Sequence, residues 1–207
     1  MTHDALIFDL DGTLWDAAPA STYGWNLALA ELCLPLRVTD EGIRSVSGQP
    51  FDRCVQILLP EISPVPGATL YFIEEHERTG IEALGGVLYE GVADGLRELC
   101  VSYPLFLVSN CPDWYVDAFF QATGLRECFT GWDCHGSSGV GKSRMLLDMC
   151  ARHHLERAVY IGDTQGDQDA AEGAGLEFVF VRYGFGEASK PALSVGSFGQ
   201  LVELFLG

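Results

Sequence analysis

The sequence is poor in basic residues. Lysine and arginine number 12 among 207 residues, against 29 aspartates and glutamates, so the formal net charge is −17. A surface of this sign repels nucleic-acid phosphates and anionic lipid, and we expect neither nucleic acid nor a membrane as a partner. A small phosphorylated metabolite can still bind if a local cation offsets the charge. That cation would be a divalent metal or one of the few basic residues, which include only two lysines, Lys142 and Lys190.

Features of secreted and membrane-spanning proteins are also missing. Near residue 1 there is no basic stretch followed by an apolar run, and no apolar run approaches the roughly 20 residues that span a bilayer. The seven cysteines include no CxxC pair, and the five histidines show no metal-site spacing. We therefore expect reduced, mostly buried thiols and a cytoplasmic location.

Strand and helix patterns alternate along most of the chain. Short apolar runs typical of buried strands lie at residues 5–8, 105–108, 158–161 and 178–181, and helical spacing lies at residues 92–100, 114–123, 143–153 and 168–173. This alternation predicts βαβ units and a parallel sheet covered by helices on both faces. The expected fold class is α/β, with a Rossmann-like parallel sheet as its core.

Residues 16–89 have a different pattern. Helical spacing recurs there at residues 22–32, 52–59 and 68–84, without a strand of comparable strength. We expect this segment to be a helical cap domain inserted after the first strand. The α/β core domain would then comprise residues 1–15 and 90–207.

Polar residues follow the expected strands or lie between them: Asp9, Asp11, Thr13, Ser109, Asn110, Lys142, Asp163 and Asp167. Functional groups of a parallel sheet gather at the carboxyl ends of its strands, so we expect these side chains to form one site. Paired carboxylates are ligands for a hard cation such as Mg²⁺, and a carboxylate can also be the nucleophile in phosphoryl transfer. A lysine and a metal would offset the negative charge of the phosphate.

The order of these motifs resembles that of the haloacid dehalogenase superfamily over nearly the whole chain. The shared motifs are DxDGT, an apolar strand ending in Ser-Asn, a lysine and GDTxxD. The resemblance implies that Asp9 is the nucleophile and a metal ligand. It implies that Asp11 is the general acid and base, with its backbone carbonyl on the metal. The phosphoryl group would be held by Thr13, Ser109 and Asn110, neutralised by Lys142, and accompanied by Mg²⁺ on Asp163 and Asp167.

The helical insertion resembles the small cap of the phosphoglycolate-phosphatase-like branch. Two positions depart from that branch, because Ser143 and Glu90 stand where proline is usual. Within the cap, Arg44 and Arg53 flank the segment SVSGQPFD, and either could bind a substrate carboxylate or second phosphate. The alternative is that both are solvated helix arginines.

A second motif competes with this interpretation. Residues 136–143, GSSGVGKS, match the P-loop pattern GxxxxGK[ST], which would bind a nucleotide. A P-loop needs a strong preceding strand, whereas residues 130–135 are only weakly strand-like. It also leaves most of the aspartates without a role, so we favour the first interpretation.

The expected function is hydrolysis of a small phosphomonoester, phosphoglycolate-like or a sugar phosphate, through an aspartyl-phosphate with Mg²⁺. Asp11 favours ester cleavage over dehalogenation, since displacement of a halide needs no proton donor. A phosphosugar mutase of the same superfamily is disfavoured, because residues 16–26 contain no histidine. A non-catalytic, metal-dependent phosphate-binding protein is a further alternative. Monomer and homodimer are both open.

Overall fold

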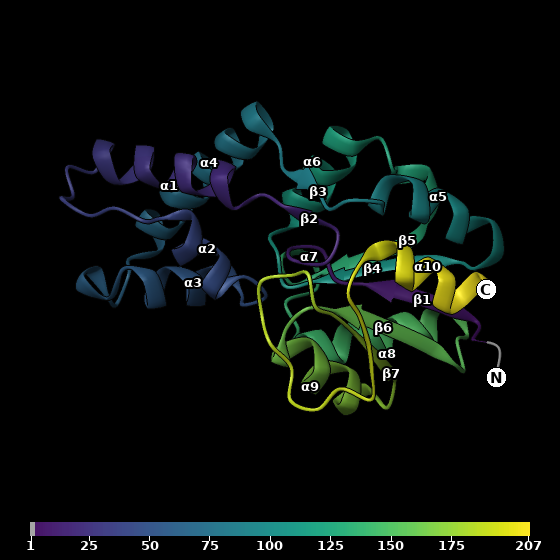
Figure 1. Ribbon diagram of the computed structural model, residues 1–207. Helices are drawn as coiled ribbons and strands as arrows, with labels where there is room; N and C mark the ends of the chain where they lie inside the picture. The colour runs from purple at the N-terminus through teal and green to yellow at the C-terminus, as the bar shows by residue number, and fades with distance from the viewer. Residues whose placement is uncertain (1–2) are drawn as a thin grey trace.

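The computed structural model describes residues 3–207, which form two lobes side by side (Figure 1). Within these residues the larger lobe contains a six-stranded sheet of order β5-β4-β1-β6-β7-β8, and every neighbouring pair is parallel. The strands are β1 (Ala5–Phe8), β4 (Leu105–Ser109), β5 (Phe129–Cys134), β6 (Ala158–Gly162), β7 (Glu177–Val181) and β8 (Leu193–Val195). The expected α/β class with a Rossmann-like parallel sheet is confirmed.

Helices cover both faces of this sheet, as Figure 1 shows. One face packs against α5 (Val92–Ser102), α6 (Asp113–Thr123) and α10 (Phe198–Leu206), and the other against α8 (Lys142–His153) and α9 (Gln165–Ala174). In β1, Leu6 and Phe8 point into the first hydrophobic cluster, while Ala5 and Ile7 point into the second. Burial on both sides explains why the strand reads as a continuous apolar run.

Strand β5 was underestimated from the sequence. Residues 130–135 are only weakly strand-like in sequence, yet β5 pairs with β4 with one register shift, and Phe129, Asp133 and Cys134 are buried. The short helix η2 (Arg126–Cys128) precedes β5, and α7 (His135–Ser138) follows it directly. The start of the P-loop-like segment is therefore a helical turn.

The smaller lobe is helical and has a hydrophobic cluster of its own. It comprises α1 (Ala18–Glu31), α2 (Asp40–Val46), α3 (Phe51–Leu58), η1 (Pro60–Ile62) and α4 (Gly67–Leu84). Trp25, Val55 and Ile73 are buried in its cluster. Two short antiparallel strands, β2 (Trp15–Asp16) and β3 (Val87–Leu88), connect this lobe to the sheet, close to the boundaries expected at residues 16 and 89.

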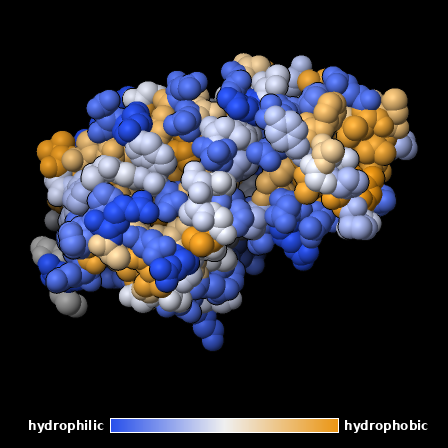
Figure 2. Space-filling model, turned by 180° about the vertical axis from the view of Figure 1, so that it is seen from behind, coloured by the Kyte–Doolittle hydropathy of each residue, from blue (hydrophilic) through white to orange (hydrophobic). Residues whose placement is uncertain are grey.

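The surface seen from behind is largely hydrophilic, with apolar residues gathered toward the far end of the helical lobe (Figure 2). Among residues 3–207, no helix is at once long enough and apolar enough to cross a bilayer.

Candidate active site

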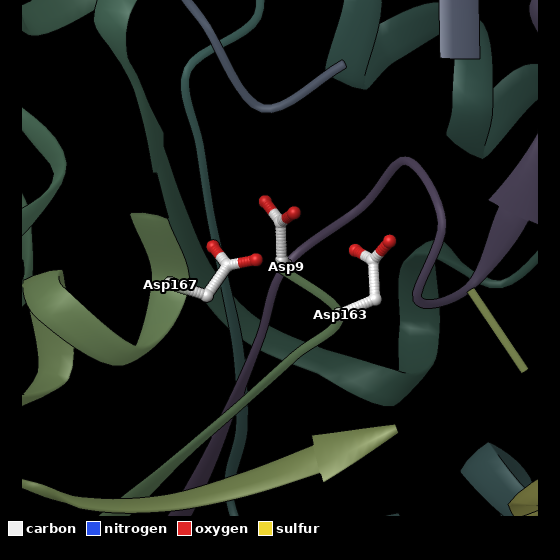
Figure 3. Close-up of side chains that lie close together, drawn as sticks. All are labelled: Asp9, Asp163 and Asp167. Atoms are coloured by element: carbon white, nitrogen blue, oxygen red, sulfur yellow. The ribbon is translucent and has the colours of Figure 1, made fainter. Parts of the chain in front are cut away.

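Three aspartates meet at the carboxyl ends of β1 and β6 (Figure 3). Asp9 directly follows β1, Asp163 directly follows β6, and Asp167 lies in the first turn of α9. One carboxylate oxygen from each residue lies within 4.8 Å of the other two. Their exposed fractions are 1%, 0% and 0%, so the sheet and its connections exclude water from this cluster almost completely.

Lys142, the first residue of α8, supplies the buried positive charge. Its Nζ donates hydrogen bonds to Asp9 Oδ1 at 2.9 Å and to Asp167 Oδ1 at 2.6 Å. Asp9 Oδ2 is buried and has no hydrogen-bond partner in the structure. One lysine does not balance three carboxylates, and oxygen ligands are those that hard divalent cations prefer. The residues present therefore fit a divalent metal ion.

The pKa values reflect this crowding of negative charge. Burial raises the pKa of Asp9 to about 7, and the charge of Asp167 adds to the effect, while Lys142 opposes it. Burial likewise raises the pKa of Asp163 to about 7, against hydrogen bonds from backbone N–H groups. Burial alone would lower the pKa of Lys142, but Asp167 and Asp9 outweigh it and hold that pKa above its ordinary value. A bound cation would stabilise both carboxylates in their ionised form.

Backbone contacts orient Asp163. Its Oδ2 accepts hydrogen bonds from the N–H groups of Phe185 and Gly186, at 2.8 and 3.3 Å. Gly12 lies against the same carboxylate with φ of +78°, and a Cβ atom there would be 2.6 Å from Asp163 Cγ. Only glycine combines this backbone conformation with such a close approach, which explains the glycine of the Asp-Gly-Thr turn.

Asp167 is held by the capping box of α9. Thr164 Oγ1 accepts from Asp167 N at 3.1 Å, and Asp167 Oδ2 accepts from Thr164 N at 3.0 Å. The Thr-x-x-Asp spacing is a recognisable helix-start signal in the sequence, so the positioning role of Thr164 could have been found there. Tyr160 also donates to Asp167 Oδ1, at 3.2 Å, and no comparable sequence signal indicated that contact.

Asp11 lies on the cap side of the cluster. Its Oδ1 accepts hydrogen bonds from Tyr115 Oη at 2.6 Å and from Trp15 Nε1 at 3.1 Å. Burial raises the pKa of Asp11 to about 7, which the hydrogen bond from Tyr115 opposes. A carboxyl with this pKa can give and take a proton near neutral pH. Its carboxylate is not one of the three that form the metal cluster. Neither Trp15 nor Tyr115 belongs to the sequence motifs, so neither contact was predicted.

The candidate phosphate ligands lie around the same point. Thr13 Oγ1 donates to Asp163 Oδ1 at 3.3 Å, and Ser109 Oγ accepts from the N–H of Cys111 at 3.4 Å. Asn110 Nδ2 donates to the backbone oxygen of Gly48 at 2.7 Å, while Asn110 Oδ1 is buried without a partner. Gly48 belongs to the loop between α2 and α3, so the cap directly contacts the core at this residue.

The two cap arginines make other contacts. Arg44 pairs with Asp16 at 2.8 Å, and Arg53 Nη1 donates to Gln56 at 3.3 Å. A role in substrate binding stays a prediction for both. Lys142, the lysine of the P-loop-like segment, forms ion pairs with Asp9 and Asp167. These ion pairs account for the lysine without a bound nucleotide.

A cavity opens from Asp11 toward the helical lobe. Asp11, Ser109 and Asn110 line it from the core, and Trp25 and Glu77 line it from the cap.

Phosphoryl transfer requires positive charge close to the phosphoryl oxygens, and Lys142 with a cation on the aspartates could supply it at the strand ends. The fold and the site therefore define a capped α/β enzyme that acts on phosphate esters. The model of one family, described as haloacid dehalogenase-like hydrolase, matches residues 3–175. The chain therefore belongs to the haloacid dehalogenase-like hydrolase family, and it is a phosphatase.

Proteins of similar sequence match this chain over nearly its whole length. A phosphoglycolate phosphatase of Rhodobacter capsulatus is 33% identical over 91% of this chain and 89% of its own length. An N-acetylmuramic acid 6-phosphate phosphatase of Pseudomonas putida is 30% identical over 87% of this chain and 83% of its own. The crystal structure of a predicted phosphoglycolate phosphatase from Haemophilus somnus shares the fold, with a TM-score of 0.83, 21% identity, and coverage of 99% and 98%. The resemblance to the phosphoglycolate-phosphatase-like branch is confirmed.

Proposed function

We propose that this phosphatase depends on Mg²⁺ and hydrolyses a small phosphomonoester through an aspartyl-phosphate on Asp9. The observation that carries the proposal is the unpartnered, buried Asp9 Oδ2 in a cluster of three aspartates within 4.8 Å of one another. Asp9, Asp163 and Asp167 would hold the ion, with the backbone of Asp11 beside them. Bound there, Mg²⁺ would supply charge neutralisation for the phosphoryl oxygens.

In the first half of the reaction, a carboxylate oxygen of Asp9 attacks phosphorus and the bond to the leaving oxygen breaks. Asp11, in its protonated form, gives that oxygen a proton so that a neutral alcohol departs. The pKa of about 7 for Asp11 supports this role. Lys142 would offset the charge of Asp9 and the phosphate, while Thr13, Ser109 and Asn110 would donate hydrogen bonds to phosphoryl oxygens.

In the second half, Asp11 takes a proton from the water that attacks phosphorus, and the bond between phosphorus and Asp9 breaks. Inorganic phosphate leaves, and both aspartates return to their starting protonation states. The contact between Asn110 and Gly48 supports a cap that covers the site and limits the entry of bulk water.

For the substrate we propose a small phosphorylated metabolite, either phosphoglycolate-like or a sugar phosphate. Relatives named for phosphoglycolate and for N-acetylmuramic acid 6-phosphate support both chemistries. The net charge of −17 disfavours nucleic acid and membrane surfaces as partners, and the seven unpaired cysteines support a cytoplasmic location. We propose a monomer or a homodimer.

The test is phosphate release from a panel of small phosphate esters, with Mg²⁺ and with a chelator. We expect release that requires the metal and is lost in Asp9→Asn. Acid quenching during turnover of ³²P-labelled ester should leave label on the wild-type protein and none on Asp9→Asn. Turnover that survives in Asp9→Asn would refute the mechanism.

A further inference from the structure

The cavity between the lobes has no basic side chain in its lining. Among the described residues that line it, Asp11 and Glu77 are acidic, and none is lysine, arginine or histidine. Arg44, one of the two cap arginines considered as substrate ligands, is paired with Asp16. A substrate carboxylate in this cavity would therefore meet negative charge without a compensating cation.

Glu77 is the acidic residue on the cap side. It lies on α4, its exposed fraction is 7%, and none of the ion pairs of residues 3–207 includes it. Burial raises the pKa of Glu77 to about 7, while hydrogen bonding from the side chains of Ser21 and Trp25 opposes the rise. At pH 8 its carboxyl is thus mainly ionised. A buried carboxylate without a cation is costly to maintain, which argues for a binding role.

Trp25 supplies a hydrogen-bond donor beside this acceptor. The residue is 1% exposed, and its Nε1 has no hydrogen-bond partner in the structure. The indole N–H is near enough to Glu77 to oppose the rise in its pKa, but it makes no well-formed hydrogen bond to the carboxylate. Both residues line the same cavity. The cavity wall therefore presents an indole N–H that lacks a protein partner beside the carboxylate of Glu77.

A hydroxyl group can form hydrogen bonds with the carboxylate of Glu77 and the indole N–H of Trp25 at the same time. Its O–H can donate to the carboxylate of Glu77, and its oxygen can accept from Nε1 of Trp25. A carboxylate has no proton to donate to Glu77, and an ammonium group has no lone pair for Trp25. Of these three groups, the hydroxyl is therefore the one that matches this part of the wall.

Helix packing fixes the positions of the two residues. A Cβ atom at Gly24 would lie 2.7 Å from the Cα of Glu77, so α1 and α4 can approach this closely only because residue 24 is glycine. Phe51 packs edge-on against Trp25, with ring centroids 5.5 Å apart. The two rings give the cavity an apolar wall beside the polar pair, which suits the carbon skeleton of a polyol or sugar.

We propose that Glu77 and Trp25 bind a hydroxyl group of the leaving alcohol, so that the enzyme prefers uncharged, hydroxylated phosphomonoesters to carboxylate-bearing ones. This inference rests on the proposed function and names its substrate class. Glu77 is the specificity-determining residue, because its charge excludes a carboxylate and its oxygens accept from the hydroxyl.

The first experiment compares esters that differ in one group. The substrates are 2-hydroxyethyl phosphate, glycerol 1-phosphate, 2-phosphoglycolate and 2-aminoethyl phosphate, each with Mg²⁺ at pH 8. We expect kcat/KM for the two hydroxylated esters to exceed that for 2-phosphoglycolate by about tenfold or more, the effect of one unmatched buried polar group. A value for 2-phosphoglycolate that equals or exceeds theirs would overturn the inference.

The second experiment uses two variants of α4. Glu77→Gln should lower the ratio of kcat/KM for 2-hydroxyethyl phosphate over 2-phosphoglycolate by about tenfold, because the repelling charge is gone. The control is Glu74→Gln, since Glu74 accepts from Trp114 Nε1 at 3.1 Å and does not line this cavity. Its ratio should stay within about twofold of wild type. An unchanged ratio in Glu77→Gln would overturn the inference.

p-Nitrophenyl phosphate separates this inference from the proposed function. Release of nitrophenol together with a preference for 2-phosphoglycolate refutes only the hydroxyl site. Release from none of the esters, p-nitrophenyl phosphate included, refutes the proposed function and the inference with it.

Discussion

The side-chain amide of Asn110 donates a 2.7 Å hydrogen bond to the backbone oxygen of Gly48. This bond joins a candidate phosphate ligand of the core to the α2–α3 loop of the cap. The amide has a second N–H, which could donate to a phosphate oxygen while the first holds Gly48. Substrate binding and cap position should therefore be coupled through this one side chain.

Removing the amide should loosen that loop. In Asn110→Ala we expect faster amide hydrogen exchange in residues 47–49 of the substrate-free protein. The increase should be about fivefold, which corresponds to a lost hydrogen bond of about 1 kcal/mol. Exchange in α4, which does not contact Asn110 through a hydrogen bond, serves as the internal control. Equal exchange in both proteins would show that the contact does not hold the loop.

Asp11→Asn should affect substrates according to their leaving group. The variant cannot give a proton, so turnover of an alkyl phosphate should fall by about 10²- to 10⁴-fold. The first step with p-nitrophenyl phosphate should fall much less, because nitrophenolate departs as a stable anion. Rapid-quench measurement of nitrophenol release checks this, with Asp117→Asn on the exposed face of α6 as the control. Equal losses on both substrates would exclude Asp11 as the proton donor.

Binding of Mg²⁺ should release protons below neutral pH. Without metal, the pKa values of Asp9 and Asp163 are raised to about 7, so both carboxyls are largely protonated at pH 6 and largely ionised at pH 8. A cation requires the ionised form, and proton release should be larger at pH 6 than at pH 8. Calorimetric titration in two buffers of different ionisation enthalpy measures the number of protons. Release that does not depend on pH would contradict the raised pKa values.

Glu77→Gln should stabilise the protein, but only at higher pH. The pKa of Glu77 is about 7 in the folded protein and about 4.5 in an exposed chain, so the folded state retains its proton longer. Between these values the unfolded state loses the proton first, and wild-type stability falls as pH rises. Above pH 7 the difference is constant at up to about 3 kcal/mol.

Urea unfolding of both proteins with chelator at pH 4 and pH 8 tests this expectation. The variant should exceed wild type in free energy of unfolding at pH 8 and match it at pH 4. Glu98→Gln, an exposed position on α5, should show no difference at either pH. A variant less stable than wild type at pH 8 would mean that Glu77 is held by partners which compensate its charge.

Much of the core was predictable from local pattern. Strands β1, β4, β6 and β7 are short apolar runs because both sheet faces are buried, and such runs are visible without a structure. Helix α10 and strand β8 were not among the predicted elements, and the pattern of β5 was weak. Strand β5 lies at the edge of the sheet and mixes buried with exposed residues, so its pattern is interrupted.

The sequence by itself determined the fold class, the family and the group of residues around Asp9. Asp9 and Asp163 directly follow strands, and Lys142 and Asp167 lie in the first turns of helices at the same sheet edge. Tertiary structure alone decided the surroundings of that group. Tyr115 lies 104 residues from Asp11 yet donates to it at 2.6 Å. Glu77 and Trp25 come together only because α1 and α4 pack closely at Gly24. Strand-end position is encoded locally, whereas contacts between elements depend on how their buried faces pack, which local pattern does not specify.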